Sequence, residues 1–197
     1  MEKYIILKEK ITMKPINNFE TVQATTGEFK RPTPNGYICK ITLVDDVPFD
    51  ANTGKGDYLK IEYDIASGEF KDYYTEQYNR FGGDFWAATM FRSYKEKALG
   101  MFKHFTNCVE NSNAGYTWAW DEKSLVGKFI GLVIGEEEYE KSDGSVGVRL
   151  YVKEVKTVQE IKDGNFKIPE LKVLKNRPVA PANNGFTEVD SSDDLPF

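Results

Sequence analysis

The chain has 197 residues, with 26 Lys and Arg against 31 Asp and Glu, a formal net charge of −5. Hydrophobic residues make up 40% of it, with 13 Phe, 11 Tyr and 3 Trp, which excludes a disordered chain. It contains no apolar run of about 18 residues, so we expect no membrane-spanning helix. The first eight residues hold too short an apolar run for a signal peptide, which favours a cytoplasmic protein. The length fits one domain with extensions.

The negative charge is unevenly distributed. The last 20 residues contain four acids and no Lys or Arg, which leaves 27 acids against 26 bases in residues 1–177, a net of −1. A body so close to neutrality can present a basic face, so the net charge does not exclude nucleic acid as a partner. A second acidic concentration, at residues 136–140, is expected to be a solvated loop.

Alternating apolar residues predict three strands in the first half of the chain. Residues 30–36, rich in Pro, Asn and Gly, lead into a strand at 37–44. A second strand spans 58–66 and, after a Ser-Gly turn signal, a third spans 69–78. The side chains expected to face inward are Tyr37, Cys39, Ile41, Leu43, Leu59, Ile61, Tyr63, Ile65, Phe70, Tyr74 and Tyr78. Those expected to face outward are Tyr58, Lys60, Glu62, Asp64, Lys71, Tyr73, Thr75 and Gln77.

The pattern changes to helical spacing over 91–111, and two further strands follow at 126–135 and 146–158. Glycines in the fourth strand suit a bulge or a sharp bend. The expected fold class is therefore mainly β, a five-stranded OB-fold barrel with one helix between strands three and four. The expected organisation is an N-terminal extension at 1–35, the barrel domain at 36–175 and a flexible acidic tail at 176–197.

The C-terminus carries the most distinctive short motif. It reads Asp193, Asp194, Leu195, Pro196 and Phe197. The two apolar side chains can fill a small pocket of a partner protein while the carboxylates meet Lys or Arg around it. Proline restricts the unbound peptide and so reduces the ordering cost of binding. The motif predicts a docking site for partner proteins on a flexible tether.

This ending resembles the acidic tip of bacterial and phage single-stranded DNA-binding proteins. The body resembles the members from phages and prophages of Gram-positive bacteria, through residues 18–24, 31–41 and 125–128, and the likeness spans about residues 15–160 plus the tip. The resemblance implies an OB-fold that binds single-stranded DNA and a tip that recruits replication, recombination and repair proteins. One departure is the thin acidic run before the tip, which Ser191 and Ser192 interrupt.

The expected outward face of strands one to three and its flanking loops combine cations with aromatic rings. The candidate nucleic-acid-binding residues are Lys40, Lys55, Tyr58, Lys60, Lys71, Tyr73, Arg80 and Phe81. Cations of this kind follow phosphates, and rings stack on unpaired bases. An ordinary solvated sheet face is the alternative interpretation of this set.

Other aromatic and reactive residues are expected to be structural. Phe85 and Trp86, in a Gly-hinged loop, are expected to pack under the barrel, with a loop that wraps a strand of DNA as the alternative. At least one of Trp118 and Trp120 is expected to belong to the core. His104 and Cys108 lie four apart on the predicted helix, without a third residue to orient them as a catalytic pair. With two Cys, one His and no ligand cluster, we expect reduced thiols, no metal and no cofactor.

The sequence therefore predicts a non-catalytic, cytoplasmic, phage- or prophage-encoded protein. We expect it to coat single-stranded DNA with little sequence preference during replication or recombination and to recruit partners through residues 193–197. Association into a homo-oligomer is compatible with the unassigned first 35 residues. The alternatives are an OB-fold protein-interaction module without DNA affinity and an enzyme such as a nuclease, for which a carboxylate cluster or metal site is missing.

Overall fold

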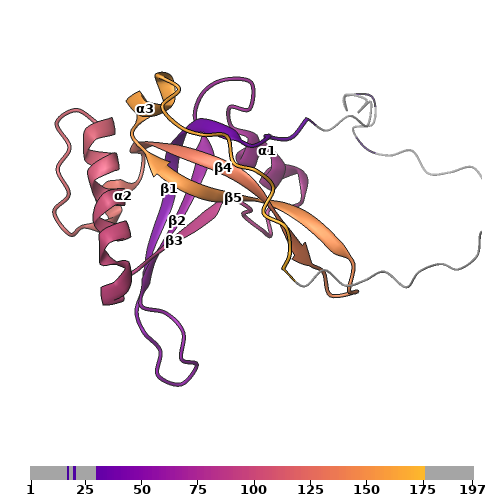
Figure 1. Ribbon diagram of the computed structural model, residues 1–197, viewed down its shortest axis with the longest axis horizontal. Coiled ribbons are helices and arrows are strands. Elements are labelled where there is room, and N and C mark those ends of the chain that lie inside the picture. Colours follow the sequence, from indigo (N-terminus) through magenta and orange to yellow (C-terminus); the bar gives the residue numbers. More distant parts are fainter. Residues whose placement is uncertain (1–16, 18–19, 21–29, 176–197) are drawn as a thin grey trace, which may run out of the picture. The chain divides into compact units, whose positions relative to one another are not determined.

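The structure, a computed structural model, describes residues 17, 20 and 30–175 (Figure 1). Contacts divide the chain into Met1–Lys30 and Arg31–Phe197, and the elements below all belong to the second unit. Its strands are β1 (Asn35–Val47), β2 (Tyr58–Ile65), β3 (Thr89–Ser93), β4 (Phe129–Glu140) and β5 (Val146–Lys156). Its α-helices are α1 (Tyr73–Arg80), α2 (Leu99–Ser112) and α3 (Val158–Lys162), with short 3-10 turns at Glu96–Ala98 and Glu122–Leu125. None of the helices in this part of the chain could cross a membrane.

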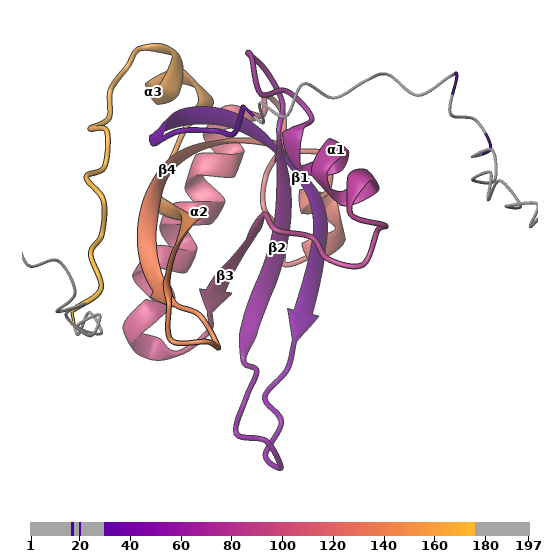
Figure 2. The ribbon, with the colours of Figure 1, turned by 90° about the vertical axis from the view of Figure 1, so that its right-hand side faces the viewer.

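The five strands form one antiparallel sheet in the order β3-β2-β1-β4-β5. The prediction of a mainly β chain with five strands, and with a helix between the third and the fourth, is confirmed. The sheet is open, because no hydrogen-bonded ladder between the described strands joins β3 to β5. The five strands that the sequence predicts as a barrel therefore do not close into one. β1 and β4 curve strongly, so that the β4–β5 arm faces β2 and β3 (Figure 2).

The hydrophobic core lies between the sheet and α2. Phe105 and Val109 of α2 are completely buried against Ile41, Ile61 and Ile130 of the sheet. Complete burial of each such side chain stabilises the fold by about 1.5–3 kcal/mol before the entropy of ordering is counted. Alternation in β1 and β2 places most of these residues as the sequence predicts.

A β-bulge corrects the predicted face of one residue in β1. The register shifts between Ile41 and Leu43, so that Leu43, expected inward, is 41% exposed, whereas Val44 is 1% exposed. An extra residue in one strand reverses the alternation beyond it. The second half of β1 therefore buries the opposite set of residues.

The predicted third strand is wrong. Residues 69–78 form a turn and most of α1, and the true third strand is β3. Phe70, Tyr74 and Tyr78 are spaced by four residues, which satisfies the alternation of a strand and the period of a helix equally well. The helix predicted at 91–111 is shorter than expected, because its first residues belong to β3 and α2 begins at Leu99.

The acidic run at 136–140 lies within β4, and its prediction as a solvated loop is also wrong. Glu136 pairs with Arg31, and Glu137 pairs with Arg149 at 2.8 Å and with Lys172 at 2.7 Å. Backbone hydrogen bonds attach Lys172 to the edge of β4 beyond the end of β1. Neighbouring cations thus allow this acidic segment to be a strand.

Asp64 fixes α1 against the sheet. Expected on the outer face, it is 4% exposed, and its carboxylate accepts hydrogen bonds from the backbone N–H of Ile65, Tyr74 and Thr75 and from the Thr75 hydroxyl. The bonds measure 2.7, 3.0, 2.8 and 2.6 Å. The first N–H groups of a helix have no partners within it, and a negative charge there is favourable. The residue at the helical cap position itself, Asp72, makes no such bond.

We expect Asp64→Asn to lower the free energy of unfolding by about 2–3 kcal/mol, because one anionic acceptor becomes an NH₂ group facing the donors of Thr75. Urea unfolding measures the change. Asp72→Asn is the matched control, since it removes the same charge from the same helix end at an exposed position and is expected to cost less than about 0.5 kcal/mol. Equal losses in the two variants would contradict the role of Asp64.

Candidate functional site

A groove of about 1450 Å³ opens between the two arms of the sheet. One wall comes from β2, β3, α1 and the segment 84–87, and the other from β4 and β5. These walls face each other in Figure 2. The groove includes residues of both unpaired edge strands, β3 and β5. Its position therefore follows from the open side of the sheet.

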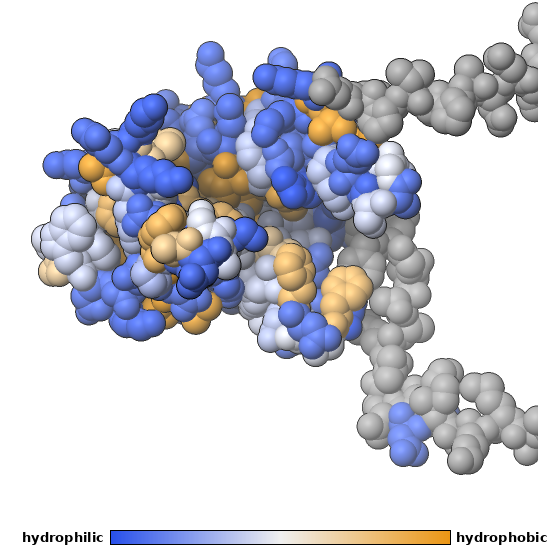
Figure 3. Space-filling model, turned by 90° about the horizontal axis from the view of Figure 1, so that it is seen from below, coloured by the Kyte–Doolittle hydropathy of each residue, from blue (hydrophilic) through white to orange (hydrophobic). Residues whose placement is uncertain are grey.

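Nine of the residues that line the groove are aromatic. They are Tyr63, Tyr73, Tyr74, Tyr78, Phe85, Trp86, Phe91, Tyr139 and Tyr151. Tyr63 and Tyr74 belong to the core, whereas Phe85 is 77% and Phe91 is 53% exposed. Seen from below, hydrophobic residues are exposed in several places between hydrophilic ones (Figure 3). The two exposed rings give the groove flat apolar surfaces that no other side chain covers fully.

Phe91 stands on β3 beside residues that the sequence marked as candidates. It lies opposite Lys60 in the register of β2 and β3, and its ring meets that of Tyr58 edge-on at 5.2 Å. Alternation puts Tyr58, Lys60 and Phe91 on the outer face of these strands, away from the core. A cation and two rings thus share one face at the groove.

The Gly-hinged loop contributes one exposed and one packed ring. Gly82 and Gly83 have φ values of 83° and 81°, which favour glycine and turn the chain after α1. Trp86 packs against the core, 5.6 Å from Tyr78, and its Nε1–H donates to the carbonyl of Ala88 at 3.1 Å. The expected packing is therefore confirmed for Trp86 and wrong for the exposed Phe85.

The two tryptophans after α2 divide in the same way. Trp118 is half-buried and packs against the core, as expected for at least one of the pair. Trp120 is 82% exposed. Neither Trp118 nor Trp120 lines the groove, so their fluorescence serves as a reference when the fluorescence of Trp86 is measured.

The groove is close to electrical neutrality. Its cations are Arg31, Lys60, Arg92 and Arg149, and its acids are Glu62, Asp84 and Glu137. Lys60 pairs with Glu62 at 2.7 Å, and this hydrogen bond is the main cause that raises the pKa of Lys60. The hydrogen bond from Lys172 is the main cause that lowers the pKa of Glu137. A bound anion would have to compete with these carboxylates for the cations.

The structure brings together only part of the predicted binding set. Lys60 and Tyr73 line the groove, and Tyr58 supports Phe91 at its edge. The residues outside its lining are Lys40, Lys55, Lys71, Arg80 and Phe81, all of them exposed. Lys40 lies on β1 and Lys55 in the loop between β1 and β2. Lys71, Arg80 and Phe81 lie elsewhere because residues 69–78 are not a strand.

Sequence reasoning missed several lining residues. They are Phe85, Phe91, Arg92, Tyr139, Arg149 and Tyr151. Arg149 and Tyr151 had an available signal, since they alternate outward on the last predicted strand. Phe91 and Arg92 had no such signal, because the helical spacing over 91–111 predicts that they begin a helix. The predicted partner-binding residues, Asp193, Asp194, Leu195, Pro196 and Phe197, lie outside the described residues.

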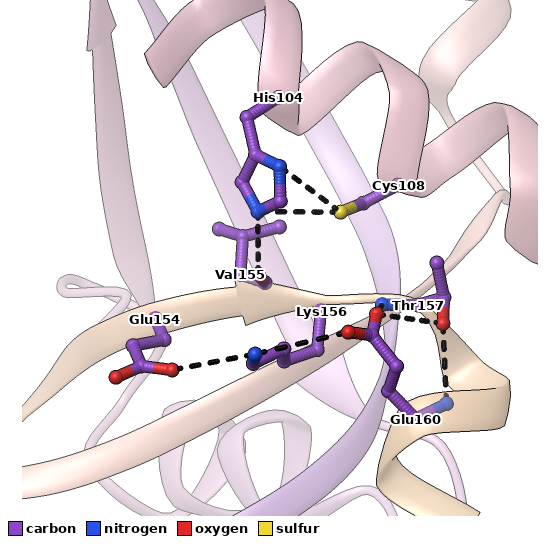
Figure 4. Close-up of polar contacts among 7 residues, drawn as sticks. All are labelled: His104, Cys108, Glu154, Val155, Lys156, Thr157 and Glu160. Atoms are coloured by element: carbon purple, nitrogen blue, oxygen red, sulfur yellow. Dashed lines mark hydrogen bonds and ion pairs between the residues drawn. The ribbon is translucent and has the colours of Figure 1, made fainter. Parts of the chain in front are cut away.

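His104 and Cys108 connect α2 to β5 (Figure 4). His104 Nε2 lies 2.9 Å from the carbonyl oxygen of Val155 and 3.6 Å from the Cys108 sulfur. Burial raises the pKa of Cys108 to about 11, so that the thiol stays protonated at neutral pH. Because the thiolate is the nucleophilic form, this geometry supports a structural contact, as the sequence suggested.

No cluster of three or more His, Cys, Asp or Glu side chains suited to a metal ion occurs within residues 30–175. Cys39 and Cys108 are both free thiols and both buried.

Comparison with the models of known protein families and with curated protein sequences yields no match.

The lowered pKa of Glu137 predicts a pH dependence of stability. Since its folded-state pKa lies below the ordinary value of 4.5, its contribution is complete above that pH and is lost as the pH falls through the lowered pKa. We expect Glu137→Gln to lose less stability than the wild type between about pH 5 and pH 3 in urea unfolding. Glu140→Gln, the same change at an exposed end of β4, serves as the control. Parallel pH profiles of wild type and Glu137→Gln would rule out this contribution.

Proposed function

We propose that the protein binds single-stranded DNA in the aromatic groove, with little sequence preference, during phage or prophage replication or recombination. The observation that carries the proposal is the pair of exposed rings, Phe85 and Phe91, beside the cations of the groove.

We further propose that the open sheet is a variant of the OB-fold, which is itself a partly open five-stranded barrel. The strand order and the position of α2 support this assignment.

Stacking supplies a physical basis for such binding. Unpaired bases expose their π-faces, and stacking on an aromatic side chain contributes about 1–3 kcal/mol per base. Phe91 and Phe85 present uncovered ring surface at the groove, and Tyr73 and Tyr151 are half-buried beside it. Every base has a π-face, so contacts of this kind tolerate any sequence.

The charges of the groove favour a modest affinity that depends only weakly on salt. Phosphates bound to Lys60 or Arg149 would displace Glu62 or Glu137 from these cations. Exchange of one ion pair for another yields less free energy than the binding of a phosphate to an unpaired cation. We therefore expect stacking to dominate, with a shallow dependence of affinity on salt.

The tryptophans give a direct test of binding. We expect oligo(dT) to quench the fluorescence of Trp120→Phe, which keeps Trp86 in the groove and removes the most exposed indole. Trp86→Phe should lose most of the quenching. Titrations at 50 and 200 mM salt should show weaker binding at the higher concentration, because counterions are released on binding.

Removal of a groove ring should weaken binding. We expect Phe91→Ala to raise the Kd for oligo(dT) by about 5- to 150-fold, equivalent to the loss of one stacked base. Phe129→Ala is the matched control, since Phe129 is also partly exposed on a strand and does not line the groove. Circular dichroism melting establishes that both variants are folded.

Other outcomes favour the alternatives. Absence of binding even at 50 mM salt would favour a protein-interaction module, for which the near-neutral groove is the supporting observation. Cleavage of the oligonucleotide after addition of Mg²⁺ would favour a nuclease. A Phe129→Ala variant as impaired as Phe91→Ala would contradict binding in the groove.

The second part of the proposal concerns residues 193–197. The tip would recruit replication or recombination proteins and, because it carries no cation, compete weakly with DNA for the basic groups of the body. We expect deletion of these five residues to increase the affinity for oligo(dT) at 50 mM salt and to leave it nearly unchanged at 200 mM salt. Affinity that is unchanged at the lower salt concentration would refute the competition.

A further inference from the structure

Arg92 occupies an unusual position for a charged residue. It lies on the edge strand β3 opposite Leu59, on the same side of the strand as Met90, and both neighbours are buried in the core. Its guanidinium lies 5.6 Å from the centre of the ring of Phe105, which is completely buried on α2. The charge is therefore directed to the core side of the sheet, where β3 has no neighbouring strand.

The hydrogen bonds of Arg92 are incomplete. Nη1 donates to the carbonyl oxygen of Phe91 at 2.8 Å, whereas the buried Nε has no partner among the described residues. No ion pair formed within residues 30–175 includes Arg92, in contrast to Lys60 and Arg149. Burial lowers its pKa, although an arginine remains charged at neutral pH. A half-buried positive charge without a counter-ion destabilises the folded protein.

Arg92 is also accessible to a ligand. It lines the large groove and a second cavity of about 510 Å³ between α2 and β5, and Val152 is the other residue shared by both. The two cavities thus meet at the open side of the sheet, between β3 and β5. The acid of the second cavity, Glu154, is oriented toward Lys156 at 3.7 Å (Figure 4).

We propose that Arg92 binds a phosphate of the single strand where the two cavities meet, as the anchoring cation of the groove. The proposal rests on the proposed function. Guanidinium groups bind phosphate through two parallel, charge-assisted hydrogen bonds, and the two Nη groups of Arg92 carry N–H donors beyond the one that bonds to Phe91. Unlike Lys60, Arg92 has no carboxylate partner within residues 30–175 to give up when the anion arrives. The same absence of a counter-ion that destabilises the free protein therefore strengthens the complex.

A different explanation exists for an inward-pointing charge on an edge strand. Such charges prevent the edge from pairing with the edge of another molecule. That explanation predicts self-association when Arg92 is replaced and no change in the affinity for DNA. The phosphate site predicts a loss of affinity in a protein that gains stability.

The test uses Arg92→Met in the full chain. We expect its Tm to rise by about 2–4 °C, because the unpaired charge is removed, and its Kd for oligo(dT) to rise about tenfold or more. The slope of log K against log salt should become shallower by about 0.7, which corresponds to one phosphate contact fewer. Arg149→Met is the control for stability, since loss of its pair with Glu137 should lower the Tm.

Several outcomes would overturn the proposal. If the wild type binds oligo(dT), an unchanged affinity and salt slope in Arg92→Met exclude the phosphate site. A Tm of Arg92→Met below that of the wild type shows that Arg92 stabilises the fold. If Arg92→Met self-associates and its affinity for oligo(dT) is unchanged, the role of Arg92 is to prevent the edge strand β3 from pairing with another molecule. Arg92→Lys, which keeps the charge and loses the paired donors, should fall between wild type and Arg92→Met in affinity.

Failure of the proposed function is distinguishable. If the wild type does not bind oligo(dT), inorganic pyrophosphate is used as the anion in thermal unfolding. A Tm increase in the wild type that is missing in Arg92→Met supports an anion site for a ligand other than DNA. No increase in either protein overturns the site together with the proposed function.

Discussion

The buried carboxylate of Asp64 is the interaction on which one wall of the groove depends. It joins β2 to the first turn of α1 through hydrogen bonds to Tyr74 and Thr75. The N-cap side chain of this short helix makes no hydrogen bond, so a strand residue supplies the acceptor and ties the start of the helix to the sheet. α1 in turn presents Tyr73 and Tyr78 to the groove and determines where the loop with Phe85 begins.

The open side of the sheet is the second constraint. β3 and β5 remain unpaired with each other, and α2 covers the core behind them, where His104 Nε2–H donates to the carbonyl oxygen of Val155 on β5 at 2.9 Å. Closure of the sheet would remove the space beside β3 that Phe91 and Arg92 line. Among the described residues, Arg92 has no counter-ion, and it lies where a ligand has access. In our proposals this local loss of stability is recovered when an anion binds.

Parts of the fold were predictable because the spacing of apolar residues along a strand or helix follows which of its side chains are buried. β2 alternates over most of its length, and α2 shows the helical spacing of its buried face. The candidate site was less predictable. Spacing by four in Phe70, Tyr74 and Tyr78 fits both a strand and a helix, and a single bulge after Ile41 reverses the face of Leu43. Neither ambiguity can be resolved from neighbouring residues alone.

The sequence by itself determined the composition class, the positions of β1, β2, β4 and β5, the helix before β4, and the uneven charge that leaves the body near neutrality. The tertiary structure alone decided which rings and cations meet. Phe91 and Tyr151 are 60 residues apart and line one groove, and Asp64 is buried only because α1 folds over it. Such juxtapositions depend on strand order and on an open sheet edge, and these arise from packing between distant segments rather than from the pattern within any one of them.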